Sequence, residues 1–187
     1  MRIIRGKLKG KKLNVPLDQS VRPTLDRHRE TIFNIIEHAS WAKNLQSIKG
    51  QWEILDLFCG TGALGLEAFS RGGKHVCFVD KSLKLCHQNI SKCALNKDDA
   101  TFIQSDILQL TLDISKFDVI FMDPPYGMNL VPKTLALLHP YLSEETVLVV
   151  EHEATLKDEC EGFEEMRIVE TKKSTIRFLK KSLQKSS

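Results

Sequence analysis

The chain has 187 residues, a formal net charge of +3, and 42% hydrophobic against 27% charged residues. These values are ordinary for a soluble globular protein and allow a substantial core, so we expect a single domain over residues 1–187. No apolar stretch approaches the roughly 20 residues that span a bilayer, and the start lacks a secretory signal, so we expect a cytoplasmic protein without membrane binding. The five cysteines lack zinc-site spacing, so we expect no metal.

The first 40 residues are basic, with nine Lys or Arg against four acids. Extended pieces around Gly6 and Gly10 predict a basic hairpin, and Thr24 is the expected N-cap of a following helix. The apolar side of that helix consists of Leu25, Ile32, Phe33 and Ile36. Its expected polar side consists of Asp26, Arg27, Arg29 and Glu30. The basic run favours an anionic partner such as nucleic acid, although solvated surface lysines explain the same run.

Strands and helices then alternate along residues 50–180. The expected strands are 54–58, 75–79, 101–104, 119–122, 146–150, 166–171 and 175–179, and the expected helices are 63–70, 83–94 and 130–138. This alternation predicts an α/β fold with a mostly parallel, doubly wound sheet and a C-terminal antiparallel hairpin. We therefore divide the chain into a basic N-terminal hairpin and helix (1–40), a core (50–180) and a basic tail (181–187).

A glycine-rich run, Asp-Leu-Phe-Cys-Gly-Thr-Gly-Ala-Leu-Gly from Asp56 to Gly65, connects an expected strand to an expected helix. Gly60 and Gly62 permit a tight turn and the close approach of a ligand, and Gly65 permits close packing of the helix on the strand. A dinucleotide fold seats pyrophosphate on such a loop, but Asp56 would repel it. The acid favours a ligand with a cationic amino-acid end, such as S-adenosylmethionine (SAM), over a nicotinamide dinucleotide.

Two further acids follow the next expected strands. Asp80 stands where an acid accepts hydrogen bonds from both hydroxyls of a ribose. Asp106 is a candidate acceptor for an adenine amine, with the N–H of Ile107 directed at a ring nitrogen. For Asp106 a helix cap or turn acid is the structural alternative.

The tetrapeptide Asp123-Pro124-Pro125-Tyr126 ends an apolar strand. Two prolines cannot continue a central strand, because neither has an N–H to donate. An acid, a stiff turn and an aromatic ring therefore emerge at the carboxyl end of the strand, where ligands bind in open parallel sheets. The combination suits a flat base that carries an exocyclic amine. The structural alternative is a proline-rich turn with Asp123 as a local cap and Tyr126 as a packing residue.

Three segments together resemble the RsmD family over about residues 1–180: Arg22-Pro-Thr-Leu-Asp-Arg-His-Arg-Glu-Thr-Ile-Phe-Asn, the glycine-rich run, and Asp-Pro-Pro-Tyr. The glycine run alone would indicate a class I methyltransferase, and Asp-Pro-Pro-Tyr alone an amino-methyltransferase. The segment that starts at Arg22 narrows the resemblance to this family. One departure is the turn Thr171-Lys-Lys-Ser, where relatives often carry an aromatic-glycine pair, so the shape of the last hairpin stays open.

The resemblance implies a Rossmann-like class I fold and SAM-dependent methylation of the exocyclic N2 of one guanine in 16S rRNA, within the small ribosomal subunit or an assembly intermediate. The implied catalytic residues are Asp123, Pro124, Pro125 and Tyr126. The cofactor-binding residues are Asp56, Phe58, Gly60, Gly62, Asp80, Asp106 and Ile107. The RNA-binding residues are Arg2, Arg5, Lys7, Lys9, Arg22, Arg27 and Arg29, of which the last three fit either a cofactor lid or an RNA groove.

Three other functions remain open at this point. The same tetrapeptide would serve an enzyme that methylates adenine N6 in DNA or RNA. A non-catalytic RNA-binding assembly factor that keeps SAM as a structural ligand is a second possibility, which the intact Asp123 and Tyr126 disfavour. A nicotinamide-dependent oxidoreductase is the third, and Asp56 argues against it.

Overall fold

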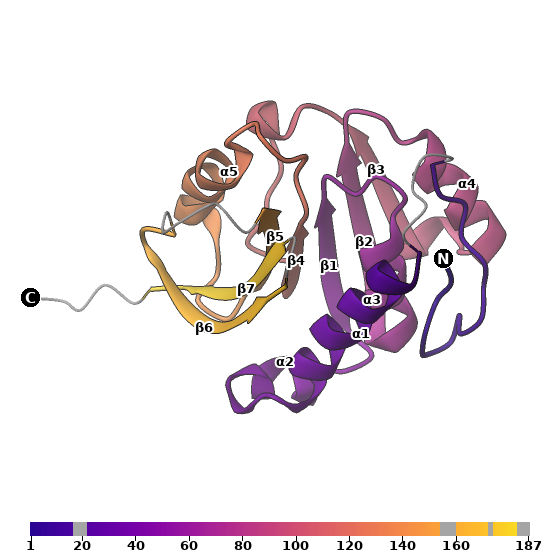
Figure 1. Cartoon of the computed structure of the whole chain (residues 1–187), viewed down its shortest axis with the longest axis horizontal. Coiled ribbons are helices and arrows are strands. Elements are labelled where there is room, and N and C mark those ends of the chain that lie inside the picture. Colours follow the sequence, from indigo (N-terminus) through magenta and orange to yellow (C-terminus); the bar gives the residue numbers. More distant parts are fainter. Residues whose placement is uncertain (17–21, 154–159, 172–173, 183–187) are drawn as a thin grey trace, which may run out of the picture.

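A computed structural model describes residues 1–16, 22–153, 160–171 and 174–182, with the backbone alone at 22–25. Its centre is a seven-stranded sheet in the order β3-β2-β1-β4-β5-β7-β6 (Figure 1). The strands are β1 (Trp52–Leu57), β2 (Gly73–Asp80), β3 (Ala100–Gln104), β4 (Val119–Met122), β5 (Val147–Glu153), β6 (Phe163–Glu170) and β7 (Ser174–Lys181). The helices are α1 (Arg22–His38), α2 (Lys43–Ser47), α3 (Ala63–Gly72), α4 (Lys84–Cys93) and α5 (Leu130–Leu138). Four 3-10 turns complete the described elements: Ser40–Ala42, Lys97–Asp99, Ile107–Gln109 and His139–Tyr141.

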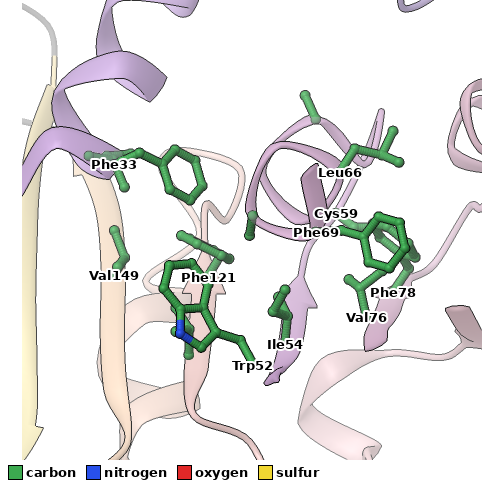
Figure 2. Packing of buried hydrophobic residues seen from close by; sticks show 14 of the residues in the cluster. Phe33, Trp52, Ile54, Cys59, Leu66, Phe69, Val76, Phe78, Phe121 and Val149 are labelled. Carbon is green, nitrogen blue, oxygen red and sulfur yellow. The ribbon is translucent and has the colours of Figure 1, made fainter. Parts of the chain in front are cut away.

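Helices cover both faces of this sheet, because its central strands are apolar on both sides. On β2, Val76 and Phe78 pack in a core with α1, α3 and α4, whereas Cys77 and Val79 pack in a second core with α5. Figure 2 shows part of the first core, with side chains from two helices over four strands, among them Phe33, Leu66, Trp52 and Phe121. The predicted doubly wound sheet is confirmed.

The strand order reverses between β1 and β4. From β1 the chain continues to β2 and β3, and then crosses to β4 on the other side of β1. Leu57 at the end of β1 is in register with Met122 at the end of β4. The glycine-rich run and the Asp-Pro-Pro-Tyr turn therefore start side by side, at the edge where open α/β sheets bind ligands.

The C-terminal strands form the expected antiparallel hairpin, in which β7 lies between β5 and β6. Lys172 and Lys173 at its turn, and the tail from residue 183, lie outside the described residues. The departure from the family pattern at this turn therefore stays untested.

The N-terminal residues form an antiparallel loop that lies on α3 (Figure 1), in agreement with the predicted hairpin. One bridge joins Arg2 to Lys12. The buried carboxylate of Glu67 on α3 accepts hydrogen bonds from the backbone N–H groups of Ile4 at 2.8 Å and Arg5 at 3.1 Å. Polar side chains of α3, which the sequence analysis did not single out, thus hold the basic segment in place.

Two expectations about the first helix were wrong. The helix begins at Arg22, so Thr24 lies inside it and is not its N-cap. Arg29, expected on the polar side, is only 4% exposed, and its guanidinium donates to the backbone carbonyl of Arg2 and to Asp26. The fold of the N-terminal loop over the helix creates this buried acceptor, which helical periodicity cannot reveal. Ile32, Phe33 and Ile36 are buried as predicted, and the side chain of Leu25 lies outside the described residues.

Candidate active site

A cavity of about 920 Å³ lies at the carboxyl ends of the central strands. Its size suits a small-molecule ligand, because ligand pockets typically enclose about 300–1,000 Å³. The lining includes eleven residues from the predicted catalytic, cofactor and RNA sets: Asp56, Phe58, Gly60, Asp80, Asp106, Ile107, Asp123, Pro124, Pro125, Tyr126 and Arg29. The fold therefore gathers residues that are up to 97 positions apart in the chain, since Arg29 and Tyr126 lie at the two ends of this set.

The floor of the cavity is built around Asp56, which is 2% exposed. Its Oδ2 atom accepts a hydrogen bond of 2.8 Å from the backbone N–H of Gly65 in the first turn of α3. Burial raises the pKa of Asp56 well above its usual range, while the bond from Gly65 acts in the opposite direction. A Cβ atom on Gly65 would lie 2.6 Å from Cε1 of Phe78, so only glycine allows this close approach.

Asp80 at the end of β2 anchors the glycine-rich loop. One carboxylate oxygen accepts from the N–H of Gly60 at 2.9 Å and the other from the N–H of Ser82 at 2.9 Å. A carboxylate has about four acceptor positions, so two remain for a ligand hydroxyl pair. Gly62 has a φ of 74° and does not line the cavity, since its Cβ position faces Cys86. Its role is in the turn itself.

Asp106 and Ile107 lie on the far side of β2, after β3. Asp106 caps the short Ile107–Gln109 turn by accepting from the N–H of Leu108 at 3.1 Å, and it pairs with Lys81 at 3.0 Å. The hydrogen bond from Lys81, and then that from Leu108, lower the pKa of Asp106. Asp106 thus caps a turn, as the structural alternative proposed, and also lines the cavity.

Asp123 emerges from the end of β4 into the same cavity. Its side chain is exposed to the cavity, but protein atoms surround it closely, and this desolvation, with the negative charge of Glu151 second, raises its pKa to about 8. Met122 is in register with Val150 of β5, so the next residues on the two strands, Asp123 and Glu151, are direct neighbours. Two carboxylates at this spacing disfavour the simultaneous ionisation of both.

The turn after Asp123 forms the mouth of the cavity. Pro124 is buried and Pro125 exposed, while the Tyr126 ring is 50% exposed. Partial burial and the charge of Glu151 raise the pKa of Tyr126 to about 12, so its hydroxyl stays neutral at physiological pH. Met128, 55% exposed, adds apolar surface beside this ring on the cavity wall. The mouth thus presents a flat aromatic ring next to a carboxylate.

The predicted RNA-binding residues occupy three different environments. Arg2 and Lys9 are exposed on the N-terminal loop, and Arg27 is exposed on α1. Arg5 forms ion pairs with glutamates at 3.7 Å and 3.8 Å, and Lys7 lies 3.4 Å above the centre of the Phe69 ring, where burial lowers its pKa. Arg29 is buried in the cavity wall, and the side chain of Arg22 lies outside the described residues.

Two of the cavity residues that the sequence analysis did not single out, Glu151 and His28, lie close to each other. Glu151 comes directly after the expected strand 146–150, as Asp123 comes after 119–122, and this is the signal that could have identified it, although β5 itself continues to Glu153. His28 on α1 approaches it, with 3.6 Å between Nδ1 of His28 and Oε1 of Glu151. The residue after Glu151, His152, instead faces β7, where Nε2 of His152 accepts a hydrogen bond from Nε of Arg177 at 3.0 Å.

The mostly parallel seven-stranded sheet, the antiparallel C-terminal hairpin and the cavity at the switch point define a Rossmann-like methyltransferase. A solved structure of a candidate methyltransferase from Escherichia coli is similar over 98% of this chain and 99% of its own, with a TM-score of 0.78 and 30% identity. That of a candidate methylase from Haemophilus influenzae is similar over 97% and 98%, with a TM-score of 0.77 and 28% identity. The predicted fold class is confirmed.

The family model described as Conserved hypothetical protein 95 matches residues 1–180, and the chain belongs to this family. A Haemophilus influenzae relative named ribosomal RNA small subunit methyltransferase D is 35% identical, over 82% of this chain and 79% of that protein. The Escherichia coli protein of the same name is 34% identical, over 82% and 75%. The resemblance to the RsmD family is confirmed. Family and fold together show that the chain is a methyltransferase, and methyltransferases of this class use SAM in general. In the described part of the chain, no helix has the length and apolarity to cross a membrane.

Proposed function

We propose that this protein transfers a methyl group from SAM to the exocyclic N2 amine of one guanine in small-subunit 16S rRNA. The observation that carries the proposal is the position of Asp123 and Tyr126 on the same cavity as three acids at or just after the carboxyl ends of β1, β2 and β3. The relatives named small subunit methyltransferases support rRNA as the substrate. The cytoplasmic location expected from the sequence belongs to the same proposal.

Three acidic side chains of the cavity support this proposal, because they can accept hydrogen bonds from the polar groups of SAM. Asp56 at the floor carries a carboxylate suited to the ammonium group, and Asp80 retains acceptor positions for the two ribose hydroxyls. Asp106 at the far side is placed to accept from the adenine amine, with the N–H of Ile107 beside it. A positively charged ligand also offsets the repulsion among these acids. SAM supplies an electrophilic methyl group on a sulfonium.

Asp123 and Pro124 provide the acceptors for the amine. The lone pair of guanine N2 is delocalised into the ring, so hydrogen bonds from the amine to the Asp123 carboxylate and the Pro124 carbonyl would favour a more tetrahedral nitrogen. They would also hold it in line for transfer, and positioning of this kind supplies much of the rate of such reactions. The ionised Asp123 further stabilises positive charge that develops on the nitrogen and can accept its proton.

Tyr126 provides a stacking surface at the mouth. Its half-exposed ring can cover one face of a base that has left its helix. Stacking on an aromatic ring contributes about 1–3 kcal/mol per base, which offsets much of the few kcal/mol required for unstacking. The exposed basic residues Arg2, Lys9 and Arg27 are then available to contact phosphates around the target.

Methyl transfer to small ribosomal subunits that lack guanine-N2 methylation tests the proposal. With methyl-labelled SAM, we expect the label in N2-methylguanosine after nucleoside analysis. Asp123→Asn should slow transfer at least about a hundredfold while SAM binding, measured by calorimetry, persists. Asp113→Asn is the matched control, because Asp113 is an acid in an exposed turn outside the cavity and should leave transfer unchanged.

Two results would contradict the proposal. Label in N6-methyladenosine would assign the protein to the alternative class of amino-methyltransferases. SAM binding without transfer to subunits or protein-free rRNA would favour the non-catalytic assembly factor.

A further inference from the structure

The carboxylate of Glu151 has no assigned role in the chemistry described above, although it lines the cavity. The parallel register of β4 and β5 pairs Met122 with Val150, so Asp123, just after β4, and Glu151, inside β5, are neighbours. Adjacent strands lie about 4.8 Å apart. The two carboxylates thus start from neighbouring backbone positions on one cavity, and each can reach a different polar atom of one bound base.

The surroundings of Glu151 leave its acceptor positions available to a ligand. In the described part of the chain, the one basic group near its carboxylate is His28, at 3.6 Å, which is beyond hydrogen-bond distance. The Glu151 side chain is 14% exposed, and that of His28 is 17% exposed. A partly buried carboxylate that receives no hydrogen bond from the described protein is costly unless a ligand supplies a donor.

We propose that Glu151 selects guanine by accepting a hydrogen bond from the N1–H of the base, while Asp123 accepts from the N2 amine. The inference rests on the proposed function and extends it from the amine to the recognition of the base. In this arrangement the two carboxylates match the two adjacent donors of guanine. Glu151 is then a specificity-determining residue, and His28 lies on its other side.

The chemistry of the base edges explains the selectivity. Guanine presents N1–H next to the N2 amine, so two carboxylates meet two donors. A purine whose N1 has no hydrogen presents a lone pair there, and a carboxylate opposite a lone pair is left without a partner at the cost of desolvation. Sites built to receive a hydrogen bond reject analogues without the donor strongly for the same reason. Electrostatics agree with this arrangement, since the charge of Glu151 contributes to the raised pKa of Asp123 and two donors on the base relieve that repulsion.

The discriminating substrate is 2-aminopurine. It keeps the 2-amine and the ribose in the positions they have in guanine, and changes N1 from a donor to an acceptor. Small-subunit rRNA with either base at the mapped target, assembled into subunits, is assayed with methyl-labelled SAM. The measured quantity is the ratio of kcat/KM for guanine to that for 2-aminopurine. Because 2-aminopurine also lacks O6, only the change of this ratio between variants reports on the residue at 151.

Glu151→Gln keeps the shape of the side chain and adds an N–H donor for the N1 of 2-aminopurine. We expect the ratio to fall at least about tenfold relative to wild type, and Glu151→Ala, with neither donor nor acceptor, to give an intermediate value. Glu144→Gln is the matched control, because Glu144 is an exposed acid in the turn before β5 and outside the cavity, and it should leave the ratio unchanged. Far-UV circular dichroism and SAM affinity verify that each variant is folded.

An unchanged ratio in folded Glu151→Gln would overturn the inference while leaving the proposed function intact. No transfer to guanine N2 by the wild-type protein would overturn both, so the two failures are distinguishable.

Discussion

The backbone N–H of Gly65 lies 2.8 Å from Oδ2 of Asp56, and this bond joins the first turn of α3 to the end of β1. It fixes the orientation of the carboxylate that we assign to the ammonium group of SAM. The contact exists only because residue 65 has no side chain: a Cβ there would lie 2.9 Å from the same oxygen and 2.6 Å from Phe78.

Gly65→Ala should therefore destabilise the protein by about 1–3 kcal/mol through overpacking and weaken SAM binding by displacing Asp56. Denaturant unfolding and calorimetry measure the two effects. Gly10→Ala is the matched control: its Cβ meets nothing within 4 Å, but its φ of +86° carries a backbone cost of its own. The control should lose stability without losing SAM affinity, and equal SAM affinity in both variants would contradict the prediction.

Asp106→Ala should weaken SAM binding about tenfold or more, because the adenine amine would lose a charged acceptor. Asp113→Ala provides the control, since Asp113 caps a turn in the same manner, accepting from the N–H of Ser115 at 3.1 Å, but lies outside the cavity. Calorimetric titration of both variants with SAM measures the difference. If the two affinities agree, Asp106 is a turn acid alone.

The pH dependence of methyl transfer should reflect Asp123. Its pKa is raised to about 8, first by desolvation and then by the charge of Glu151, and the ionised form is the acceptor for the amine. We expect kcat/KM, which reports on the free enzyme, to rise from pH 6 to 9 with a midpoint that belongs to the Asp123–Glu151 pair. Glu151→Gln removes the neighbouring charge and should move the midpoint to lower pH. A flat profile, or an unmoved midpoint in the variant, would contradict this assignment.

Stability should have the opposite dependence on pH over part of this range. The pKa of Asp123 in the folded protein, about 8, exceeds the unfolded value of about 4. Between these values the folded protein retains a proton that the unfolded chain has lost, so this group's contribution to stability decreases as the pH rises. The denaturant midpoint of the wild type should therefore fall as the pH rises from 5 to 8. The midpoint of Asp123→Asn, which has no carboxyl at this position, should fall less over the same range.

The salt dependence of RNA affinity should distinguish the exposed lysines of the N-terminal loop from other exposed lysines of the protein. Each phosphate contact to single-stranded RNA contributes about −0.7 to the slope of log affinity against log salt. Replacing Lys9 and Lys11 by alanine should make the slope shallower by about 1.4. Alanine at Lys116 and Lys133, which are exposed but distant in sequence from the loop, should leave it unchanged. Equal slopes for the two double variants would remove the N-terminal loop from the RNA-binding surface.

Glu67 should be the strongest single support of the N-terminal loop. Its fully buried carboxylate binds Nε of Arg71 at 2.7 Å in addition to the backbone of Ile4 and Arg5. Glu67→Ala would leave Arg71 buried with only Glu37, at 3.3 Å, and should cost about 3 kcal/mol. Glu30→Ala removes an exposed pair with Arg5 and should cost less than about 1 kcal/mol. Urea unfolding of both variants measures the difference in unfolding free energy. Similar losses in the two variants would contradict the prediction that the buried hydrogen bonds of Glu67 contribute more than the exposed ion pair of Glu30.

The sequence by itself determined the fold class and four of the five acids that line the cavity. Local signals sufficed, because an acid at or just after the end of an apolar strand must lie at the carboxyl edge of a parallel sheet. Asp56, Asp80, Asp106 and Asp123 were identified in this way, and all four line one cavity. Helix and strand positions in the core followed from apolar periodicity alone, as with the helix Leu130–Leu138.

Only the tertiary structure decided which polar groups meet across the chain. Arg29 is buried because the N-terminal loop brings the carbonyl of Arg2 over α1, and helical periodicity contains no information about that loop. The pairing of Glu151 with Asp123 depends on the register of β4 and β5, which residues far from either acid determine. Sequence patterns report what one segment does locally, whereas the recognition of a base depends on distances between segments, and packing alone sets those distances.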